Sequence, residues 1–250
     1  MLLRRGFATT AGDLLLPFPA DLPAPLAARL AERLSHYAFR LFLRGALRAG
    51  PVFAPHEATR YLDREQALRL ADELVELRLA VREGDGRYRL LHPVRSFGGT
   101  LEWYVARELG GRYGFDVAVN RKFHAPGVGG DLDVVAAAEG KLIYAELKSS
   151  PPKHLSSEEV RAFLDRVHAL RPDVALFVMD TALRLGDRVV PMLEAALRAR
   201  RPDAPSARRV ERELWALGPH LYAVNARPDL IANLAQAIAE GLRMLAPAIA

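Results

Sequence analysis

Acidic side chains interrupt two apolar segments that are each about as long as a β-strand. The first segment reads Gly-Gly-Asp-Leu-Asp-Val-Val over 129–135, and the second reads Leu-Ile-Tyr-Ala-Glu-Leu-Lys over 142–148. Successive side chains of a strand alternate between its faces, so Glu146 and Lys148 point the same way, as do the two aspartates of the first segment. Unpaired carboxylates are costly to bury in an apolar sheet, and a divalent cation is the usual compensation. The pattern indicates a site that binds a metal ion and activates water.

The composition is that of an ordinary globular protein. With 250 residues, 50% of them hydrophobic, the chain can bury a sizeable core, and its length permits one or two domains. Cysteine is absent, which excludes disulfides, thiolate metal sites and cysteine nucleophiles and favours a cytoplasmic setting. The seven histidines are scattered, which disfavours a histidine-rich zinc site. We find no signal peptide or membrane-spanning run in the sequence and expect no membrane partner.

The charge balance is moderately basic. A net charge of +5 and an isoelectric point near 9.7 are compatible with a nucleic-acid partner. They do not establish one, because charged residues of both signs, 26% of the chain, are interspersed. Arginine greatly outnumbers lysine, and asparagine and glutamine are scarce, a usage typical of a thermophilic source or of GC-rich coding.

The N-terminal part predicts an arm and a small helical domain. Closely spaced prolines indicate an extended arm, and apolar residues at helical spacing predict a long amphipathic helix after it. Asp63 and Gln66 form an N-cap signature for a later helix, and an Asp-Gly turn indicates a hairpin. The expected elements are an arm at 1–26, one helix at 27–50, a short helix near 56–62, a helix from 63 to about 80, and two short strands within 81–90.

This order of elements resembles a DNA-binding winged helix over roughly 27–95. The third helix offers arginines for DNA but also several acidic residues, which repel phosphate. The better phosphate candidates are the hairpin arginines Arg82, Arg87 and Arg89, although exposed edges also carry charge simply to prevent aggregation. DNA contact therefore stays open beside two alternatives, a docking module and a surface that pairs two copies into a homodimer.

The C-terminal part predicts alternating helices and strands. Glu139-Gly140 is a tight turn between the two acidic strands, and Ser156 with Glu159 is a capping box that opens a helix. The short apolar run 174–179 is typical of a strand buried on both faces. The expected order is α-β-β-β-α-β-α-β-α, with helices at about 100–112, 156–171, 189–200 and 228–245 and strands at about 115–121, 129–135, 142–148, 174–179 and 220–224; a loop containing Pro126 follows the first strand.

Asp133 in one strand, Glu146-Leu147-Lys148 in the next and Glu102 on the preceding helix resemble the signature of the PD-(D/E)XK nuclease superfamily. The resemblance covers about 97–181, and its motif form is most similar to resolvase-type and Mrr-like members and to nuclease modules of CRISPR ancillary effectors. It implies an α/β fold with a restriction-endonuclease-like mixed sheet flanked by helices over 97–250, preceded by the smaller winged-helix-like domain over 27–96.

The resemblance also implies a metal-dependent endonuclease, with Mg²⁺ or Mn²⁺ as cofactor and nucleic acid, DNA more than RNA, as substrate. Phosphodiester hydrolysis needs neutralised phosphoryl oxygens, a hydroxide-like nucleophile and a stabilised leaving oxygen. Asp133, Glu146 and the backbone carbonyl of Leu147 are the expected metal ligands. Lys148 is expected to orient or deprotonate the attacking water, with a pKa lowered by the metal. Glu102 is expected to hold a second metal ion or a metal-bound water.

Two observations support a catalytic role for Lys148, and one alternative explanation opposes it. The chain contains only four lysines among its 35 basic residues, and arginine cannot be deprotonated, so chemistry is a reason for a lysine here. The alternative is a structural pair of Glu146 and Lys148 at a solvated strand end. A protein that keeps the nuclease fold, binds nucleic acid and is catalytically silent is the alternative function.

Further residues near the motif are weaker candidates. Asp131 either assists a second ion or lies at an exposed strand start. The loop residues Lys122 and His124 and the residues after the second strand, Lys153 and His154, are candidates for phosphate contact. At helical spacing, one of Trp103 and Tyr104 is more typical of the core than of a base-stacking platform.

Overall fold

The protein is described by a computed structural model that covers residues 1–123, 125 and 127–245. The chain forms two compact units, a larger one made of Met1–Asp13 with the chain from Val105 onward, and a smaller one made of Leu14–Tyr104. The boundaries of the units therefore lie near 13 and 104, and not at the predicted positions 26 and 96. Each unit has its own sheet and is described by itself.

The larger unit is built on one eight-stranded mixed sheet. The strand order is β1-β5-β6-β7-β8-β11-β10-β9, and all neighbours are antiparallel except β7 with β8 and β8 with β11, which are parallel. The predicted α/β class with a mixed sheet is confirmed. The strands are β1 (Thr9–Ala11), β5 (Asp116–Phe123), β6 (Asp131–Ala138), β7 (Lys141–Lys148), β8 (Val174–Met179), β9 (Arg208–Glu211), β10 (Leu214–Ala216) and β11 (Leu221–Asn225).

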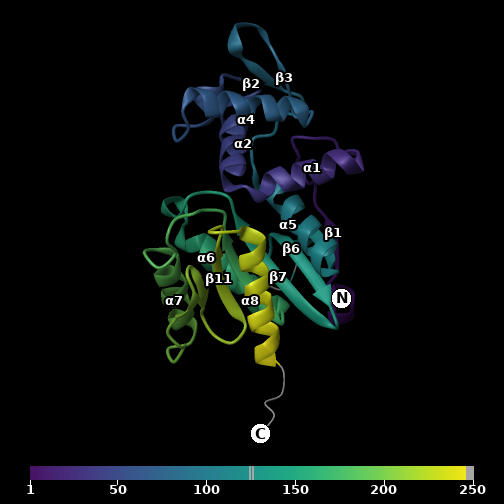
Figure 1. The fold of residues 1–250 in the computed structure, drawn as a ribbon. Coiled ribbons are helices and arrows are strands. Elements are labelled where there is room, and N and C mark those ends of the chain that lie inside the picture. Colours follow the sequence, from purple (N-terminus) through teal and green to yellow (C-terminus); the bar gives the residue numbers. More distant parts are fainter. Residues whose placement is uncertain (124, 126, 246–250) are drawn as a thin grey trace. The chain divides into compact units, whose positions relative to one another are not determined.

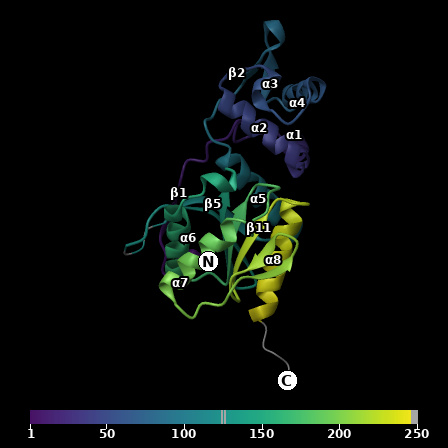
Figure 2. The same cartoon turned by 90° about the vertical axis from the view of Figure 1, so that its left-hand side faces the viewer.

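Helices flank both faces of this sheet, as Figures 1 and 2 show. The face that carries Tyr144 and Phe177 packs against α6 (Ser157–Leu170) and α7 (Val189–Arg200), and these residues form the main core. The other face packs against α8 (Leu230–Leu245), which lies along β8 and β11. The chain enters the unit along α5 (Gly98–Tyr113). The predicted helices are confirmed to within two residues at most ends.

The hairpin of β6 and β7 has a two-residue turn that pins its register. Glu139 and Gly140 both have positive φ, 50° and 76°, the conformation whose twist matches that of the flanking strands. The ladder pairs Val135 with Tyr144 and ends with Val134 opposite Ala145. The two strand positions that follow this last pair are Asp133 and Glu146, so the predicted turn places the acidic residues at the end of the ladder.

The N-terminal residues are not a loose arm, contrary to the prediction for 1–26. Thr9–Ala11 forms the edge strand β1, paired with the end of β5. Arg5 donates to the carbonyl of Arg171 at 2.8 Å and pairs with Asp173 at 2.5 Å. A strand of three residues is too short to produce a readable alternation, which is why the sequence gives no sign of it. The hairpin of β9 and β10 was also not predicted.

The smaller unit contains four helices and a three-stranded sheet in the order β2-β4-β3. Its capping box, in which the Asp63 carboxylate accepts from Gln66 N–H at 2.7 Å, is confirmed, and so is the hairpin around the Asp-Gly turn. Two predicted helices are shorter than expected: α3 spans four residues and α4 ends at Glu76. The elements are α1 (Ala24–Ser35), α2 (Tyr37–Ala49), β2 (Val52–Phe53), α3 (Pro55–Ala58), α4 (Arg64–Glu76), β3 (Ala80–Arg82) and β4 (Tyr88–Leu90).

The single helix predicted over 27–50 is wrong, because the chain breaks at His36, whose φ and ψ are −83° and 118°. Buried Arg40 on α2 reaches back and donates to the carbonyls of Leu34 at 2.5 Å and Ser35 at 3.0 Å. These last carbonyls of α1 have no intrahelical partner. The guanidinium satisfies them, so α1 ends where the apolar pattern alone predicts continuation.

Gly45 allows α2 and α3 to touch. A methyl group at Gly45 would lie 1.7 Å from the carbonyl oxygen of Ala58. Replacing a helical glycine by alanine normally stabilises by about 1 kcal/mol, but here we expect Gly45→Ala to destabilise the protein by about 2 kcal/mol or more through overpacking. Urea unfolding measures this. Gly111→Ala on α5, where nothing lies within 4 Å, is the matched control and should be neutral or stabilising. A Gly45→Ala protein as stable as wild type would contradict this packing.

Candidate active site

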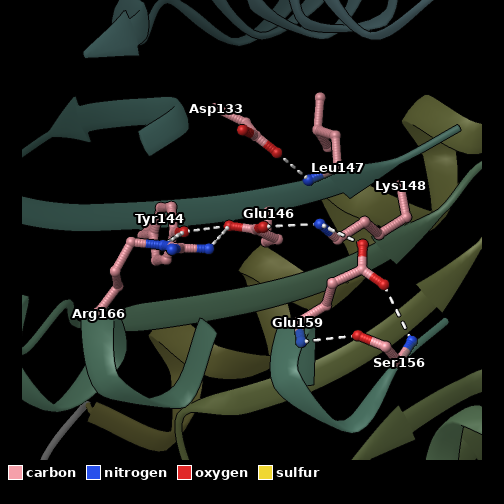
Figure 3. A network of polar contacts seen from close by, with 8 residues as sticks. All are labelled: Asp133, Tyr144, Glu146, Leu147, Lys148, Ser156, Glu159 and Arg166. Atoms are coloured by element: carbon pink, nitrogen blue, oxygen red, sulfur yellow. Dashed lines mark hydrogen bonds and ion pairs between the residues drawn. The ribbon is translucent and has the colours of Figure 1, made fainter. Parts of the chain in front are cut away.

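Glu146 is a buried carboxylate, 3% exposed, surrounded by hydrogen-bond donors (Figure 3). Its Oε2 accepts from the Tyr144 hydroxyl and from Arg166 Nη2 at 2.7 Å, and its Oε1 pairs with Lys148 Nζ at 3.1 Å. Tyr144, Glu146 and Lys148 share one face of β7, as the alternation of the strand requires. Because removing one partner of a buried ion pair typically costs about 3–5 kcal/mol, this network fixes the strand and the helix beside it.

Arg166 comes from α6 and is itself buried, with 8% of its surface exposed. Its Nε donates to the Tyr144 hydroxyl at 2.9 Å. Burial lowers the pKa of Arg166, but the neighbouring Tyr144 and Glu146 outweigh it, so the net shift is upward and the guanidinium is charged. Burial, followed by the charge of Glu146, raises the pKa of Tyr144 well above its usual value. The tyrosine is therefore a protonated donor to Glu146.

Lys148 lies between two carboxylates. Besides Glu146, its Nζ contacts Glu159 Oε1 at 3.2 Å, and the lysine side chain is 19% exposed. Ser156 and Glu159 form the predicted capping box of α6, with Glu159 Oε2 accepting from Ser156 N–H at 2.9 Å. The Glu159 side chain thus caps α6 and also pairs with Lys148. The structural alternative predicted that Glu146 and Lys148 pair at a solvated strand end. The pair is present, but the Glu146 side chain is buried and the Lys148 side chain is mostly buried.

The pKa fall that Lys148 would undergo beside a metal ion stays a prediction, and the groups of the protein itself shift this pKa in the other direction. Burial lowers the pKa of this ammonium, but Glu146 and then Glu159 raise it, and the net shift is upward. Lys148 is protonated in this state and has donors but no lone pair to offer. It is therefore able to orient a water molecule or to bind a phosphate oxygen.

Beyond the last backbone pair of the β6–β7 ladder, the side chain of Asp133 makes the hydrogen bond to β7. Its Oδ2 accepts from the backbone N–H of Leu147 at 2.7 Å, and Figure 3 shows the carboxylate at this edge of the strand. The N–H and C=O of a strand residue point to the same neighbour, so the Leu147 carbonyl faces the β6 side as well. Asp133 and Leu147 thus lie together, as predicted, and Glu146 is the next residue along β7.

The glycine doublet before Asp131 has a structural reason. Gly130 has a φ of 105°, and a Cβ there would lie 3.1 Å from Arg166 Nη1. A side chain at 130 would be strained and would push against the guanidinium. Arg166 therefore joins α6 to the strand β7 and lies next to the turn that leads into β6.

The oxygen donors have the chemistry that Mg²⁺ and Mn²⁺ prefer, but their arrangement does not fit a metal ion. Glu146 is held by two cations and a hydroxyl, and one Asp133 oxygen is held by Leu147. Across 1–123, 125 and 127–245, no three His, Asp or Glu side chains gather closely enough to bind a metal. A divalent ion at Glu146 would have to displace a donor.

The structure also locates Glu102 and Asp131 within their own elements. Glu102 lies on the first half of α5, within the smaller unit, and its role stays a prediction. Asp131 is exposed at the start of β6, opposite Lys122 of β5. His124 and Pro126 lie outside the described residues.

The structure also gives the positions of the weaker candidates for phosphate contact and base stacking. Lys153 and His154 are exposed on the short 3-10 helix Pro152–His154. Tyr104 is buried, and Trp103 packs edge-on against Phe18 at 5.0 Å, as expected of core aromatics.

Sequence reasoning missed Arg166 and Tyr144. The alternation that links Glu146 to Lys148 also places Tyr144 on the same face, so that residue could have been found. Arg166 carried a fainter signal: it lies among the buried residues of α6, such as Phe163 and Leu170, where a charged side chain needs a partner.

The hairpin arginines of the smaller unit are accompanied by acids. Arg82 pairs with Asp72 at 2.8 Å, and Arg89 pairs with Glu83 at 2.5 Å. Arg87 lies 3.8 Å from Glu57. These carboxylates offset much of the positive charge that would attract a phosphate backbone.

Comparison with known proteins gives a fold and no family. No protein-family model and no curated protein matches the chain. Protein VC1899 from Vibrio cholerae is similar in structure, with 16% identity and a TM-score of 0.56 over 96% of this chain and 60% of that one. Can2 from Sulfobacillus thermosulfidooxidans, solved in complex with cyclic tetra-adenylate, has 17% identity and a TM-score of 0.46 over 96% and 59%.

The likeness to VC1899 shows a shared fold at low identity. The chain spans about 60% of the length of the two solved structures. In the part of the chain that the structure describes, no helix combines the length and the apolar character needed to cross a membrane.

The Lys148–Glu159 contact predicts a pKa that can be measured. Burial raises the pKa of Glu159, but the Ser156 N–H and the Lys148 ammonium outweigh it and hold the pKa below 4.5. Because the pKa is lowered on folding, this contact stabilises the fold above pH 4.5 and stops doing so as the pH falls through the Glu159 pKa. We expect Lys148→Met to raise the Glu159 pKa in a ¹³C NMR titration.

Lys141→Met is the matched control, since Lys141 lies at the far end of β7 and faces Asp173. It should leave the Glu159 titration unchanged. The stability difference between wild type and Lys148→Met should also narrow in acid. An unchanged Glu159 pKa in Lys148→Met would contradict the contact.

Proposed function

We propose that this chain is a nuclease of the PD-(D/E)XK type that hydrolyses phosphodiester bonds of nucleic acid, DNA in preference to RNA. The observation that carries the proposal is the joint position of Asp133, Glu146 and Lys148 at the end of one hairpin ladder. The mixed α/β sheet around them and the superfamily motif support it. The Mg²⁺ or Mn²⁺ requirement is part of the proposal and is the part that the experiment below tests.

Each residue has a role that follows from its contacts. Lys148 is the cation best placed for substrate, because its ammonium is charged and partly exposed while the other cation of the network, Arg166, is buried. It would donate to a phosphate oxygen or hold the attacking water in line. Glu146 and Glu159 fix the lysine from two sides. Asp133 holds the Leu147 backbone and so aligns the strand that carries both Glu146 and Lys148.

The smaller unit would bind nucleic acid or a second protein. Its order α2-β2-α3-α4-β3-β4, with the sheet β2-β4-β3, supports a winged-helix-like module. The acids beside the hairpin arginines favour docking or pairing of two copies over tight DNA binding by this hairpin.

One observation favours the alternative function, a catalytically silent protein that binds nucleic acid. Glu146 is neutralised by Arg166 and Lys148, and a carboxylate so engaged has no free oxygen for other ligands. In this case Lys148 and the surrounding cations would bind phosphate without cleaving the chain.

Incubation of the purified protein with single- and double-stranded DNA and RNA, each with Mg²⁺, Mn²⁺ or a chelator, decides between the two. We expect cleavage that the chelator abolishes. Asp133→Ala and Lys148→Ala should each lower the rate by about 100-fold or more, the usual contribution of a positioned catalytic group. The control is Glu158→Gln, an exposed α6 residue paired with Arg161, which should cleave as wild type does.

Cleavage that survives both substitutions, or that proceeds in chelator, would refute the proposed mechanism. Binding of nucleic acid in a gel-shift assay with no cleavage under any condition would favour the silent alternative.

A further inference from the structure

A hollow of about 510 Å³ lies on the larger unit, between the C-terminal halves of α6 and α7 and the turn that joins β10 to β11. The two helices pack side by side on one face of the sheet (Figures 1 and 2). The floor of the hollow is apolar and is formed by Leu164, Val167, Leu197, Leu217 and Leu221. These side chains belong to the main core or pack against it, so the fold holds the floor in place. The volume is in the range of about 300–1,000 Å³ that is usual for small-molecule sites.

The rim of the hollow is basic. Among the described residues that line it, the charged or titratable side chains are Arg200, Arg201, His168 and His220. Arg200 pairs with Asp165 at 2.9 Å and Arg201 with Asp203 at 3.3 Å, but neither aspartate lines the hollow. The Arg201 and Asp203 side chains are 63% and 83% exposed, and ion pairs as exposed as this contribute little. The Arg201 guanidinium can therefore turn to an anion in the hollow.

The hollow is separate from the candidate active site. The strands β7, β8 and β11 are parallel, and Lys148 ends β7 whereas His220 directly precedes β11. On α6, Glu159 in the first turn contacts Lys148, and His168 near the end of the helix lines the hollow. At 1.5 Å per residue, these two α6 positions are about 13 Å apart along the helix axis. The hollow is thus a second site and not an extension of the first.

We propose that this hollow binds a small aromatic anion, with its ring on the apolar floor and its anionic group against Arg200 and Arg201. The floor removes the ring from water, which favours binding. Guanidinium groups are planar and stack on aromatic faces, and they donate charge-assisted hydrogen bonds to anionic oxygens. A cation would meet like charge on the rim, and a neutral ring would use only the floor. The proposal goes beyond the proposed function and does not rest on it.

Fluorescence titration of the full chain with 8-anilinonaphthalene-1-sulfonate, an aromatic sulfonate, tests this. N-phenyl-1-naphthylamine, which has the same rings and no sulfonate, is the neutral comparison. We expect one sulfonate probe to bind per chain, and more tightly than the neutral compound. Arg201→Gln should weaken sulfonate binding about fivefold, the effect of removing one charge about 4 Å from another in water. It should leave binding of the neutral compound unchanged, whereas Leu197→Gln should weaken binding of both.

Arg243→Gln is the matched control. It removes the same charge from an exposed side chain of α8, which packs on the other face of the sheet, and it should not change the affinity for either compound. Near-ultraviolet circular dichroism establishes that each variant is folded. If Leu197→Gln does not fold, Arg201→Gln decides by itself, because its side chain is mostly exposed.

Three outcomes would overturn the proposal. They are no sulfonate binding by the wild-type chain, equal affinity for the charged and the neutral compound, and the same sulfonate affinity in Arg201→Gln and Arg243→Gln. The second outcome would mean that the hollow is a purely apolar groove, which would suit an apolar segment of a protein partner instead. The titration contains neither nucleic acid nor metal ion, so its result does not depend on the cleavage assay.

Discussion

A carboxylate buried in the middle of a mixed sheet is the constraint on which the larger unit depends. Glu146 is almost inaccessible, and an unpaired charge in that position would be pushed out or neutralised. The chain surrounds it with a tyrosine hydroxyl, a guanidinium and an ammonium. Buried pairs of this kind are weak contributors to net stability, yet breaking one is costly. The network therefore specifies which helix and which turn must lie beside β7.

Helix α6 is placed by the same constraint. It begins at the Ser156 capping box, and Glu159, the acid of that box, also holds Lys148. Arg166 follows seven residues later, two helical turns along the same side, and reaches Glu146. A single amphipathic helix thus supplies an anion to the lysine and a cation to the glutamate. Phe163 lies between them and packs on Tyr144 and Phe177, so the polar network has an apolar base.

The sequence was most informative where local chemistry decides the structure. Glu139-Gly140, the Ser156 box and the apolar run 174–179 each act within a few residues, and each was predicted. It was misleading where a contact outside the apolar pattern decides. The break at His36 depends on Arg40 reaching back to the last carbonyls of α1. β1 is a strand only because β5 offers an edge more than 100 residues later.

The same distinction between local rules and contacts that the pattern does not show applies to the candidate site. Spacing alone brought Asp133, Glu146 and Lys148 together, because a tight turn and strand alternation are local rules. The contact of Lys148 with Glu159 could not be predicted, since the sequence does not show that Glu159 would lie beside it. Arg166 was missed for the same reason.

Glu146 is neutralised by side chains of the same protein, and this compensation supports the folded sheet. If Glu146 waited for a metal ion with no internal partner, the buried charge would destabilise the sheet whenever metal was scarce. With Arg166 and Lys148 in place, the charge of Glu146 is compensated by the protein itself. The Gly130 turn supports this interpretation, because it leaves room for the guanidinium where a side chain would press on it. A residue that served only to fill the core would not need a charged group, a tyrosine partner and a cleared turn at once. The arrangement is best understood as a carboxylate kept in register by the cations and the hydroxyl of its own chain.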